Sequence, residues 1–293
     1  MEANPLTEIT MAEGHEYNPD ADPQQRMEQI GSAFESQDYA LVVPECNELM
    51  RRWAREGQQD DALELAQKVE KYRVQIEDAQ PELLNGFDAS IAEAYLYAGD
   101  SENENLTGAA ERYQRVADTE LVDVPVDGTQ LPAAERTKYC EVFNAMDRLG
   151  DEAFLGGRYK EAGNNFADAL LRRAEFMDDP NEQGPIACAN YGAAASAFMD
   201  GELEKARGFI TEALQRLEGL EASEDTLYTH VQTLEVAIDQ FEGLDTDQRQ
   251  QVLDNLDNAI RQQGGSNGGV KHFNFGEMYT EAVKEISEEA GEM

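Results

Sequence analysis

The chain has 293 residues and a formal net charge of −38, from 61 Asp and Glu against 23 Lys and Arg. Such a chain has no basic stripe that could neutralise phosphates, so we expect no direct nucleic-acid binding. Hydrophobic residues make up 41% of the chain, which is enough to bury a core and argues against global disorder. No run of about 18 apolar residues is present, so no membrane-spanning helix is expected.

The first 23 residues are polar and contain three prolines, and we expect them to form a flexible acidic tail. They include no apolar stretch of the kind that signal peptides carry, so none is predicted. From residue 24 to residue 263 almost every segment has the 3.6-residue apolar period of an amphipathic helix. We therefore predict an all-α domain over residues 24–263.

The predicted helices pair around Gly57, Gly99, Gly157, Gly201 and Gly243. Glycine is expected there because it adopts the left-handed conformation at a helix C-terminus without steric cost. About five helical hairpins at a recurring spacing are typical of a solenoid, in which each unit buries its apolar face on its neighbours. The expected pairs are 44–56 with 59–79, 82–98 with 106–118, 133–155 with 159–177, 186–200 with 203–217, and 225–242 with 246–262.

The glycine-rich residues 264–274 are predicted to form a flexible linker. Residues 275–293 are predicted to form a tethered amphipathic helix, because apolar side chains recur on one face. This helix has two equally favoured destinations: a cap on its own solenoid, or a contact that joins it to another chain, including a second copy. The apolar residues of this candidate assembly helix are Met278, Tyr279, Ala282, Val283 and Ile286.

The clearest repeat pattern lies in residues 146–170. Its members are Leu149-Gly150, the turn glycine Gly157, then Ala162, Phe166 and Ala169. This pattern resembles the tetratricopeptide repeat, in which small residues let two helices approach and an aromatic ring fills the groove between repeats. The resemblance implies a right-handed solenoid for the repeat domain.

In that family the first helix of each hairpin lines a groove that holds a peptide or a partner helix. The resemblance therefore implies that a protein or peptide segment binds to a groove formed by Asn144, Asp147, Arg148, Asp151, Tyr191, Ala195 and Phe198. Asn144 and Arg148, four residues apart on one helix face, could grip a carboxylate. The favoured alternative is that Arg148 pairs with neighbouring acids such as Asp147, Asp151 or Glu152.

The sequence contains no pattern that is typical of a catalytic, cofactor or metal site. The three cysteines, Cys46, Cys140 and Cys188, are far apart and have no histidine nearby, which favours structural thiols. We therefore expect no enzyme activity, cofactor or dedicated metal site, only nonspecific cations and hydration water on the acidic surface. Trp53 lies in the only locally basic stretch, 49–55; it marks either an interface or, as we favour, a core residue beside acid-paired arginines.

The acid surplus also resembles the composition of proteins from halophilic archaea and their viruses, with 7 Lys against 16 Arg. Self-repulsion is screened once the Debye length falls to about 3 Å near 1 M salt. We expect a cytoplasmic location in a halophilic archaeon, or association with a virion. The predicted function is a protein–protein interaction adaptor or assembly scaffold. The alternatives are a structural subunit of a large assembly that forms homo-oligomers through its C-terminal helix, and a ligand-responsive regulatory sensor.

Overall fold

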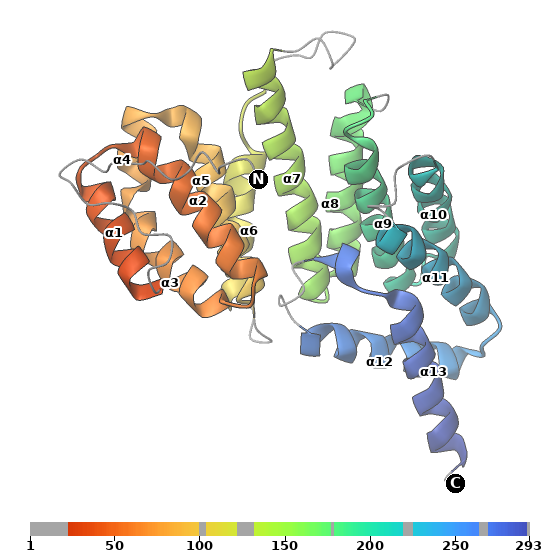
Figure 1. Cartoon of the computed structure of the whole chain (residues 1–293). Coiled ribbons are helices and arrows are strands. Elements are labelled where there is room, and N and C mark those ends of the chain that lie inside the picture. Colours follow the sequence, from red (N-terminus) through yellow and green to blue (C-terminus); the bar gives the residue numbers. More distant parts are fainter. Residues whose placement is uncertain are drawn as a thin grey trace, which may run out of the picture.

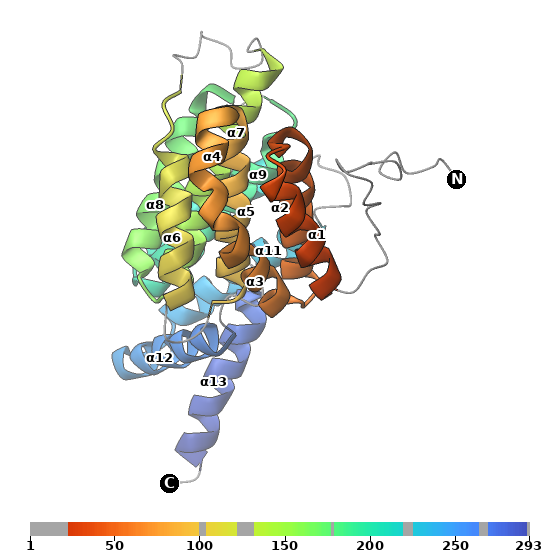
Figure 2. The same cartoon turned by 90° about the vertical axis from the view of Figure 1, so that its left-hand side faces the viewer.

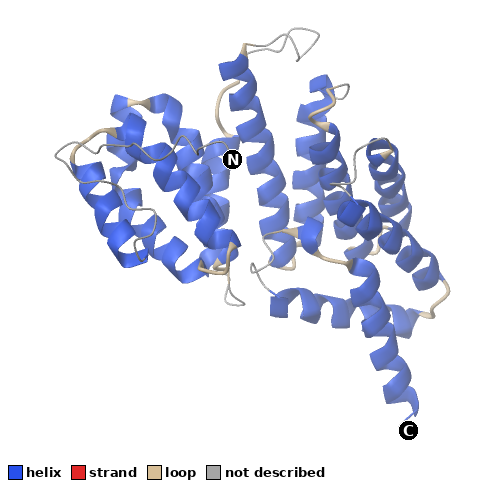
Figure 3. Cartoon of the chain, in the orientation of Figure 1, coloured by secondary structure: helices blue, strands red, loops and turns tan. Residues whose placement is uncertain are grey.

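The computed structural model describes residues 23–99, 104–121, 132–176, 179–218, 225–263 and 269–291. Every regular element within these ranges is a helix, and none is a strand (Figure 3). The predicted all-α class is therefore confirmed. Residues 1–22 of the expected tail and residues 264–268 of the expected linker lie outside the described residues.

The helices follow one another along the chain in a row of packed neighbours (Figure 1). Those of the first half are α1 (Pro23–Glu35), α2 (Tyr39–Arg55), α3 (Gln59–Val69), η2 (Glu70–Tyr72), α4 (Arg73–Ala79), η3 (Pro81–Leu83), α5 (Leu84–Tyr97) and α6 (Glu104–Ala117). Those of the second half are α7 (Ala133–Leu155), α8 (Tyr159–Arg172), η5 (Arg173–Phe176), α9 (Gln183–Met199), α10 (Leu203–Leu217), α11 (Asp225–Glu242), α12 (Thr246–Gln263), η8 (Val270–His272) and α13 (Phe275–Gly291).

Most helix bounds lie close to the expected ones, with two main exceptions. The expected helix 59–79 is divided into α3, η2 and α4. Helix α2 begins at Tyr39 rather than at Pro44, which lies inside the helix. Tyr39 and Val43 are buried in the core, so the burial of the first turn outweighs the backbone hydrogen bond that proline cannot donate.

The apolar core has two large parts that meet at α5, and Tyr139, Phe143 and Phe176 form a third, small cluster. Phe87 and Ile91 belong to the part formed with α1 to α3, whereas Ala92 and Leu96 belong to the larger part that extends to α13. One helix thus supplies both parts with side chains from adjacent turns, and the packing is continuous along the chain.

The repeat-like segment packs around the ring of Phe166 on α8. This ring lies between two glycines: a Cβ atom at Gly150 of α7 would lie 2.7 Å from it, and one at Gly192 of α9 would lie 2.6 Å from it. Both glycines therefore provide the space that the ring fills. Among the expected turn glycines, Gly57, Gly157 and Gly201 have left-handed φ values of 85°, 72° and 76°, whereas the prediction is wrong for Gly99 and Gly243, which have no positive φ.

The last expected hairpin is rearranged by α13. Helix α11 packs on α10, α9 and α13, and α12 also packs on α13. In both views α12 lies across the lower ends of the preceding helices, and α13 extends away from them to the C-terminus (Figures 1 and 2). Helix α13 therefore packs on both α11 and α12, the two helices that were expected to pack on each other as a hairpin.

Residues 270–274 were assigned to the linker by their glycine-rich context, but they are ordered by burial. They form η8 and its exit, and the side chains of Val270 and Phe273 are each 1% exposed. Two apolar side chains in the core outweigh the flexibility that the preceding glycines suggested.

A candidate partner-binding groove

A cavity of about 600 Å³ opens between α2, α5, α7, α9 and η8. The four predicted groove residues of α7 line this cavity: Asn144, Asp147, Arg148 and Asp151. Their spacing along α7 places them on one face of the helix. Helix α2 contributes Arg51 and Arg55, and η8 contributes Val270, Lys271 and His272, which the sequence analysis did not select.

The predicted groove residues of α9 lie beneath the chain's own C-terminal part. Tyr191 is fully buried, and its hydroxyl donates a hydrogen bond to the carbonyl of Phe273 at 2.7 Å. Phe198 is also fully buried and contacts Tyr279 edge-on at a centroid distance of 6.5 Å. Ala195 is buried in the same core. The structure therefore does not place these three residues together with the four of α7 in one open groove.

Residues 269–275, here called the C-terminal segment, are held by side chains of three helices. Asp151 of α7 accepts the N–H of Val270 at 2.8 Å. Tyr191 of α9 binds the carbonyl of Phe273, and Nδ1 of His230 on α11 lies 3.0 Å from the carbonyl of Lys271. A carbonyl only accepts, so this Nδ1 carries the proton. Each contact joins a side chain to the main chain of the segment.

Gly269 brings the segment against Asp151. Its φ is 140°, and a Cβ atom there would lie 2.5 Å from Oδ2 of Asp151. Any other residue would therefore clash with the carboxylate and adopt an unfavourable φ. This glycine has a positional role, whereas the sequence analysis treated it only as part of a flexible linker.

Positive charge gathers at one side of the cavity, around Glu93 of α5. Arg55 donates to Glu93 Oε1 through Nε at 3.0 Å and through Nη2 at 2.8 Å. Arg51 lies 3.5 Å and Arg148 3.9 Å from the same carboxylate. Together with Lys271, these arginines make four cationic side chains in the cavity lining. The lining also has four carboxylates, Glu93, Glu141, Asp147 and Asp151. The cavity is therefore charge-balanced in a chain whose net charge is −38.

Burial changes the protonation behaviour of these groups. It raises the pKa of Asp147 to about 6, against the opposing charge of Arg173. It also raises the pKa of Asp151, against Arg148 and the N–H of Val270. Partial desolvation and the neighbouring cations Lys271 and Arg148 lower the pKa of His272 to about 4, so this ring is neutral near pH 7.

Arg173 is buried beside two of the residues that line the cavity, and the sequence analysis missed it. Its side chain is 1% exposed; Nη1 lies 2.7 Å from Asp147, and Nη2 donates to Oδ1 of Asn144 at 3.2 Å. The oxygen of Asn144 is therefore engaged, and Arg148 pairs with Asp151 at 3.0 Å, as the favoured alternative predicted. Trp53 is 2% exposed, so the core interpretation of this residue is confirmed as well.

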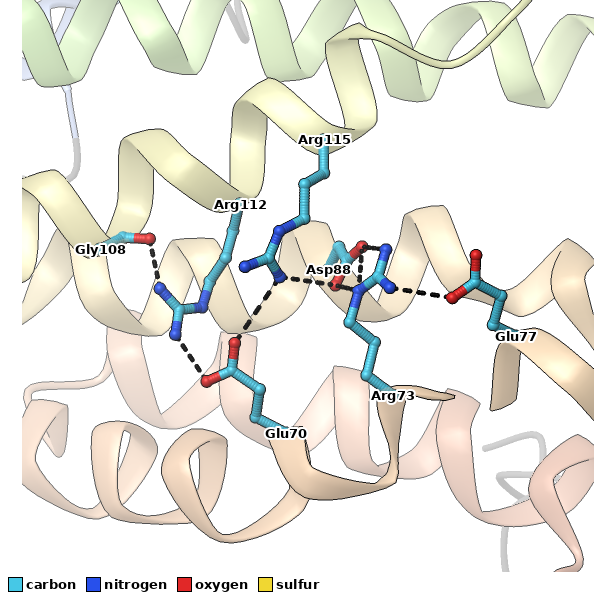
Figure 4. A network of polar contacts seen from close by, with 7 residues as sticks. All are labelled: Glu70, Arg73, Glu77, Asp88, Gly108, Arg112 and Arg115. Carbon is cyan, nitrogen blue, oxygen red and sulfur yellow. Dashed lines mark hydrogen bonds and ion pairs between the residues drawn. The ribbon is translucent and has the colours of Figure 1, made fainter. Parts of the chain in front are cut away.

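A second ionic network joins η2, α4, α5 and α6 (Figure 4). Asp88, which is 2% exposed, accepts hydrogen bonds from Arg73 at 3.0 and 3.1 Å. Arg112 donates to Glu70 at 2.6 Å, and Arg115 lies 3.7 Å from Glu70 and 3.8 Å from Asp88. Here, as in the cavity, the scarce arginines bridge different helices.

The candidate assembly helix packs on its own chain. Tyr279 and Ala282 are buried in the core, and Met278, Val283 and Ile286 are partly buried against it. In the described residues, no group of three or more His, Cys, Asp or Glu side chains could hold a metal ion. None of the described helices is long and apolar enough to cross a membrane.

Comparison of the chain with family models, with curated proteins and with solved structures gave no significant match. The likeness to the tetratricopeptide repeat therefore rests on the residues and their packing alone.

Proposed function

We propose that this protein is an interaction adaptor or assembly scaffold that holds a segment of a partner protein in the cavity beside η8. The observation that carries the proposal is the cavity itself, about 600 Å³ in volume and lined by four cations and four carboxylates from α2, α5, α7 and η8. This volume lies within the usual range of binding sites. The 3₁₀ turn of η8, a segment of the chain itself, already lies along one side of it, which supports a peptide as its occupant.

We propose further that the fold is a right-handed solenoid of the tetratricopeptide type. The packing of each helix from α5 to α11 on the next one supports this. The ring of Phe166 between Gly150 and Gly192 supports it too, because a small residue and an aromatic ring at these places are what the repeat pattern requires.

We also propose that the protein works at high salt, in a halophilic cytoplasm or in a virion. The net charge of −38 supports this, and so does the use of arginines as bridges between helices. With the cations engaged in this way, the surplus acids are left to repel one another unless salt screens them.

Site-specific photo-crosslinking tests the adaptor proposal. A photoreactive amino acid replaces Ala89, which lines the cavity, and a matched control replaces Leu171 on α8, which is 72% exposed and lies outside the cavity lining. In multimolar KCl we expect a discrete crosslinked partner at position 89 but not at 171. This product disappears when Arg51 and Arg55 are both replaced by Glu. Equal crosslinking at both positions, or none at 89, contradicts the proposal.

A structural subunit is the second candidate, and the position of α13 favours it. This helix extends from the body at the end of the chain (Figure 2), and its apolar face packs on α11 and α12 of the same chain. Joining copies would require exchange of this helix. Light scattering in multimolar KCl, on the full chain and on residues 1–263, tests this. If the full chain forms a large oligomer and residues 1–263 do not, the structural-subunit proposal is supported. If both proteins are monomeric, it is contradicted.

A ligand-responsive sensor would use the same cavity. A small ligand that binds only the folded state raises its stability by linkage. Thermal unfolding with a panel of small organic acids and bases tests this candidate, and a Tm that none of them raises argues against it.

A further inference from the structure

We infer that Asp151, Tyr191 and His230 form a docking face for a segment of the pattern Val-x-x-Phe-x-Phe that enters a helix through a 3₁₀ turn, and that the C-terminal segment is its intramolecular ligand. A partner segment with the same pattern displaces it. The displacement by a partner rests on the proposed adaptor function, whereas the docking face rests on contacts within the chain.

The first argument is the kind of hydrogen bond that holds the segment. Asp151 accepts a main-chain N–H, Tyr191 donates to a main-chain carbonyl, and His230 meets a second carbonyl. The three side chains come from α7, α9 and α11, and they converge on the main chain of the 3₁₀ turn of η8 and its exit. Contacts of this kind bind main-chain groups, which every residue except proline carries in full.

The second argument is which side chains of the segment are buried. Val270, Phe273 and Phe275 are at most 1% exposed, whereas Lys271 and His272 are exposed to solvent. Phe275 meets Phe154 at a centroid distance of 5.7 Å and Tyr191 at 6.3 Å. The buried positions define the pattern Val-x-x-Phe-x-Phe, and the exposed positions leave the intervening residues free to vary.

The third argument is that the docking face adjoins the open cavity. Asp151 pairs with Arg148 at 3.0 Å, so its charge stays compensated when the segment leaves. Val270, Lys271 and His272 also line the cavity, so a partner in the cavity touches the segment directly. The segment is joined covalently to α12 through residues 264–268. A ligand that belongs to the same chain competes with a free partner segment at an effective concentration on the order of millimolar.

A cleavable tether tests the inference on the folded full-length chain. A protease site replaces residues 264–268, and the purified protein is cut in multimolar KCl. A fluorescent synthetic peptide of residues 269–293 is then added, and its anisotropy reports exchange with the released fragment. Far-UV circular dichroism before and after exchange reports whether the remainder stays helical.

Comparing the binding of three peptides tests the Val-x-x-Phe-x-Phe pattern. The wild-type peptide is expected to bind saturably to the cut protein and far more weakly to the uncut protein, where the tethered copy competes. Replacing Phe273 and Phe275 by Ala is expected to weaken binding by at least about 100-fold, because each aromatic loses its burial. Replacing Glu281 and Glu285 by Ala, the matched control, is expected to change binding by less than about 3-fold, because both side chains are exposed and lie outside the cavity lining.

A substitution in the docking face tests the same contact from the protein rather than from the peptide. Tyr191→Phe removes the hydroxyl that binds the carbonyl of Phe273 and keeps the ring, so we expect about 10-fold weaker peptide binding. The inference is overturned if the cut protein shows no saturable exchange, if both double variants bind alike, or if the helical signal is lost once the fragment leaves. The crosslinking at position 89 has an independent readout, so failure of either proposal is visible without the other.

Discussion

Replacing Gly192 by Ala tests the packing around which the repeat-like segment is built. The added Cβ atom would lie 2.6, 2.7 and 2.8 Å from three carbons of the Phe166 ring. Carbon atoms pack best at about 3.5–4.0 Å, so three contacts are too short by about 1 Å. The ring has little room to move toward α7, because it lies so close to the backbone of Gly150 that a Cβ atom there would also come within 2.7 Å of it.

The magnitude follows from two opposing effects. Overpacking of a filled core costs about 1–3 kcal/mol, and three short contacts with a ring held on both sides place the cost near the upper end. Ala favours a helix interior over Gly by about 1 kcal/mol, which offsets part of it. We therefore expect Gly192→Ala to lower the free energy of unfolding by about 2 kcal/mol.

Chemical unfolding in multimolar KCl measures this free energy, and Gly208→Ala is the matched control. Gly208 lies within α10, and a Cβ atom there meets nothing within 4 Å, so this variant is expected to gain about 1 kcal/mol. Phe166→Leu in the Gly192→Ala background should recover much of the loss by shrinking the clamped side chain. If Gly192→Ala is as stable as Gly208→Ala, the ring is not clamped and the packing argument fails.

Three further predictions concern charge. Arg173→Ala leaves Asp147 and Glu182 without the cation that faces them at 2.7 and 3.6 Å. We expect urea unfolding to show a free energy of unfolding that is lower by about 3–5 kcal/mol. A decrease below about 1 kcal/mol would mean that the two ion pairs contribute little. The pKa of Asp147 rises in the folded state from 3.8 to about 6, so its contribution to stability is present at low pH and is lost as the pH rises through this window. Asp147→Asn should therefore show a flatter decline in unfolding free energy with rising pH than the wild type, and equal slopes would contradict this. Finally, thermal scans should show the Tm rising from 0.1 to about 1 M KCl as the Debye length falls from about 10 to about 3 Å, and an unchanged Tm would contradict adaptation to high salt.

The helical class could be predicted because it depends on local information. The 3.6-residue period recurs in nearly every segment, and the bounds expected for α7 and α10 are the ones observed. Gly57 and Gly157 could be identified as turn residues because a left-handed φ is a local requirement that glycine meets at least cost. The core position of Trp53 could be predicted in the same way, from its place on an apolar helix face.

The groove could be predicted only in part. The four residues of α7 share one helix face, so periodicity placed them together, and they line the cavity. Tyr191 and Phe198 share a face of α9 as well, but they are covered by a segment about 80 residues further along the chain. No periodicity within α9 carries information about which distant segment packs on it.

The charges illustrate the same limit. A count of acids and bases established that the chain carries a large excess of negative charge. It did not establish that Arg51, Arg55 and Arg148 converge on Glu93, or that Arg173 is buried beneath Asp147. Ion pairs between helices depend on how the helices approach, which the composition does not encode.

The sequence by itself thus determined the helical class, the places of most helices and turns, and the acidic character of the chain, because each depends on neighbouring residues or on sums over all of them. Only the tertiary structure decided that residues 270–275 leave the linker for the docking face, and that α13 separates α11 from α12 in the packing. Burial of Val270, Phe273 and Phe275 is a contact between distant parts of the chain, and the free energy of such contacts outweighs local flexibility.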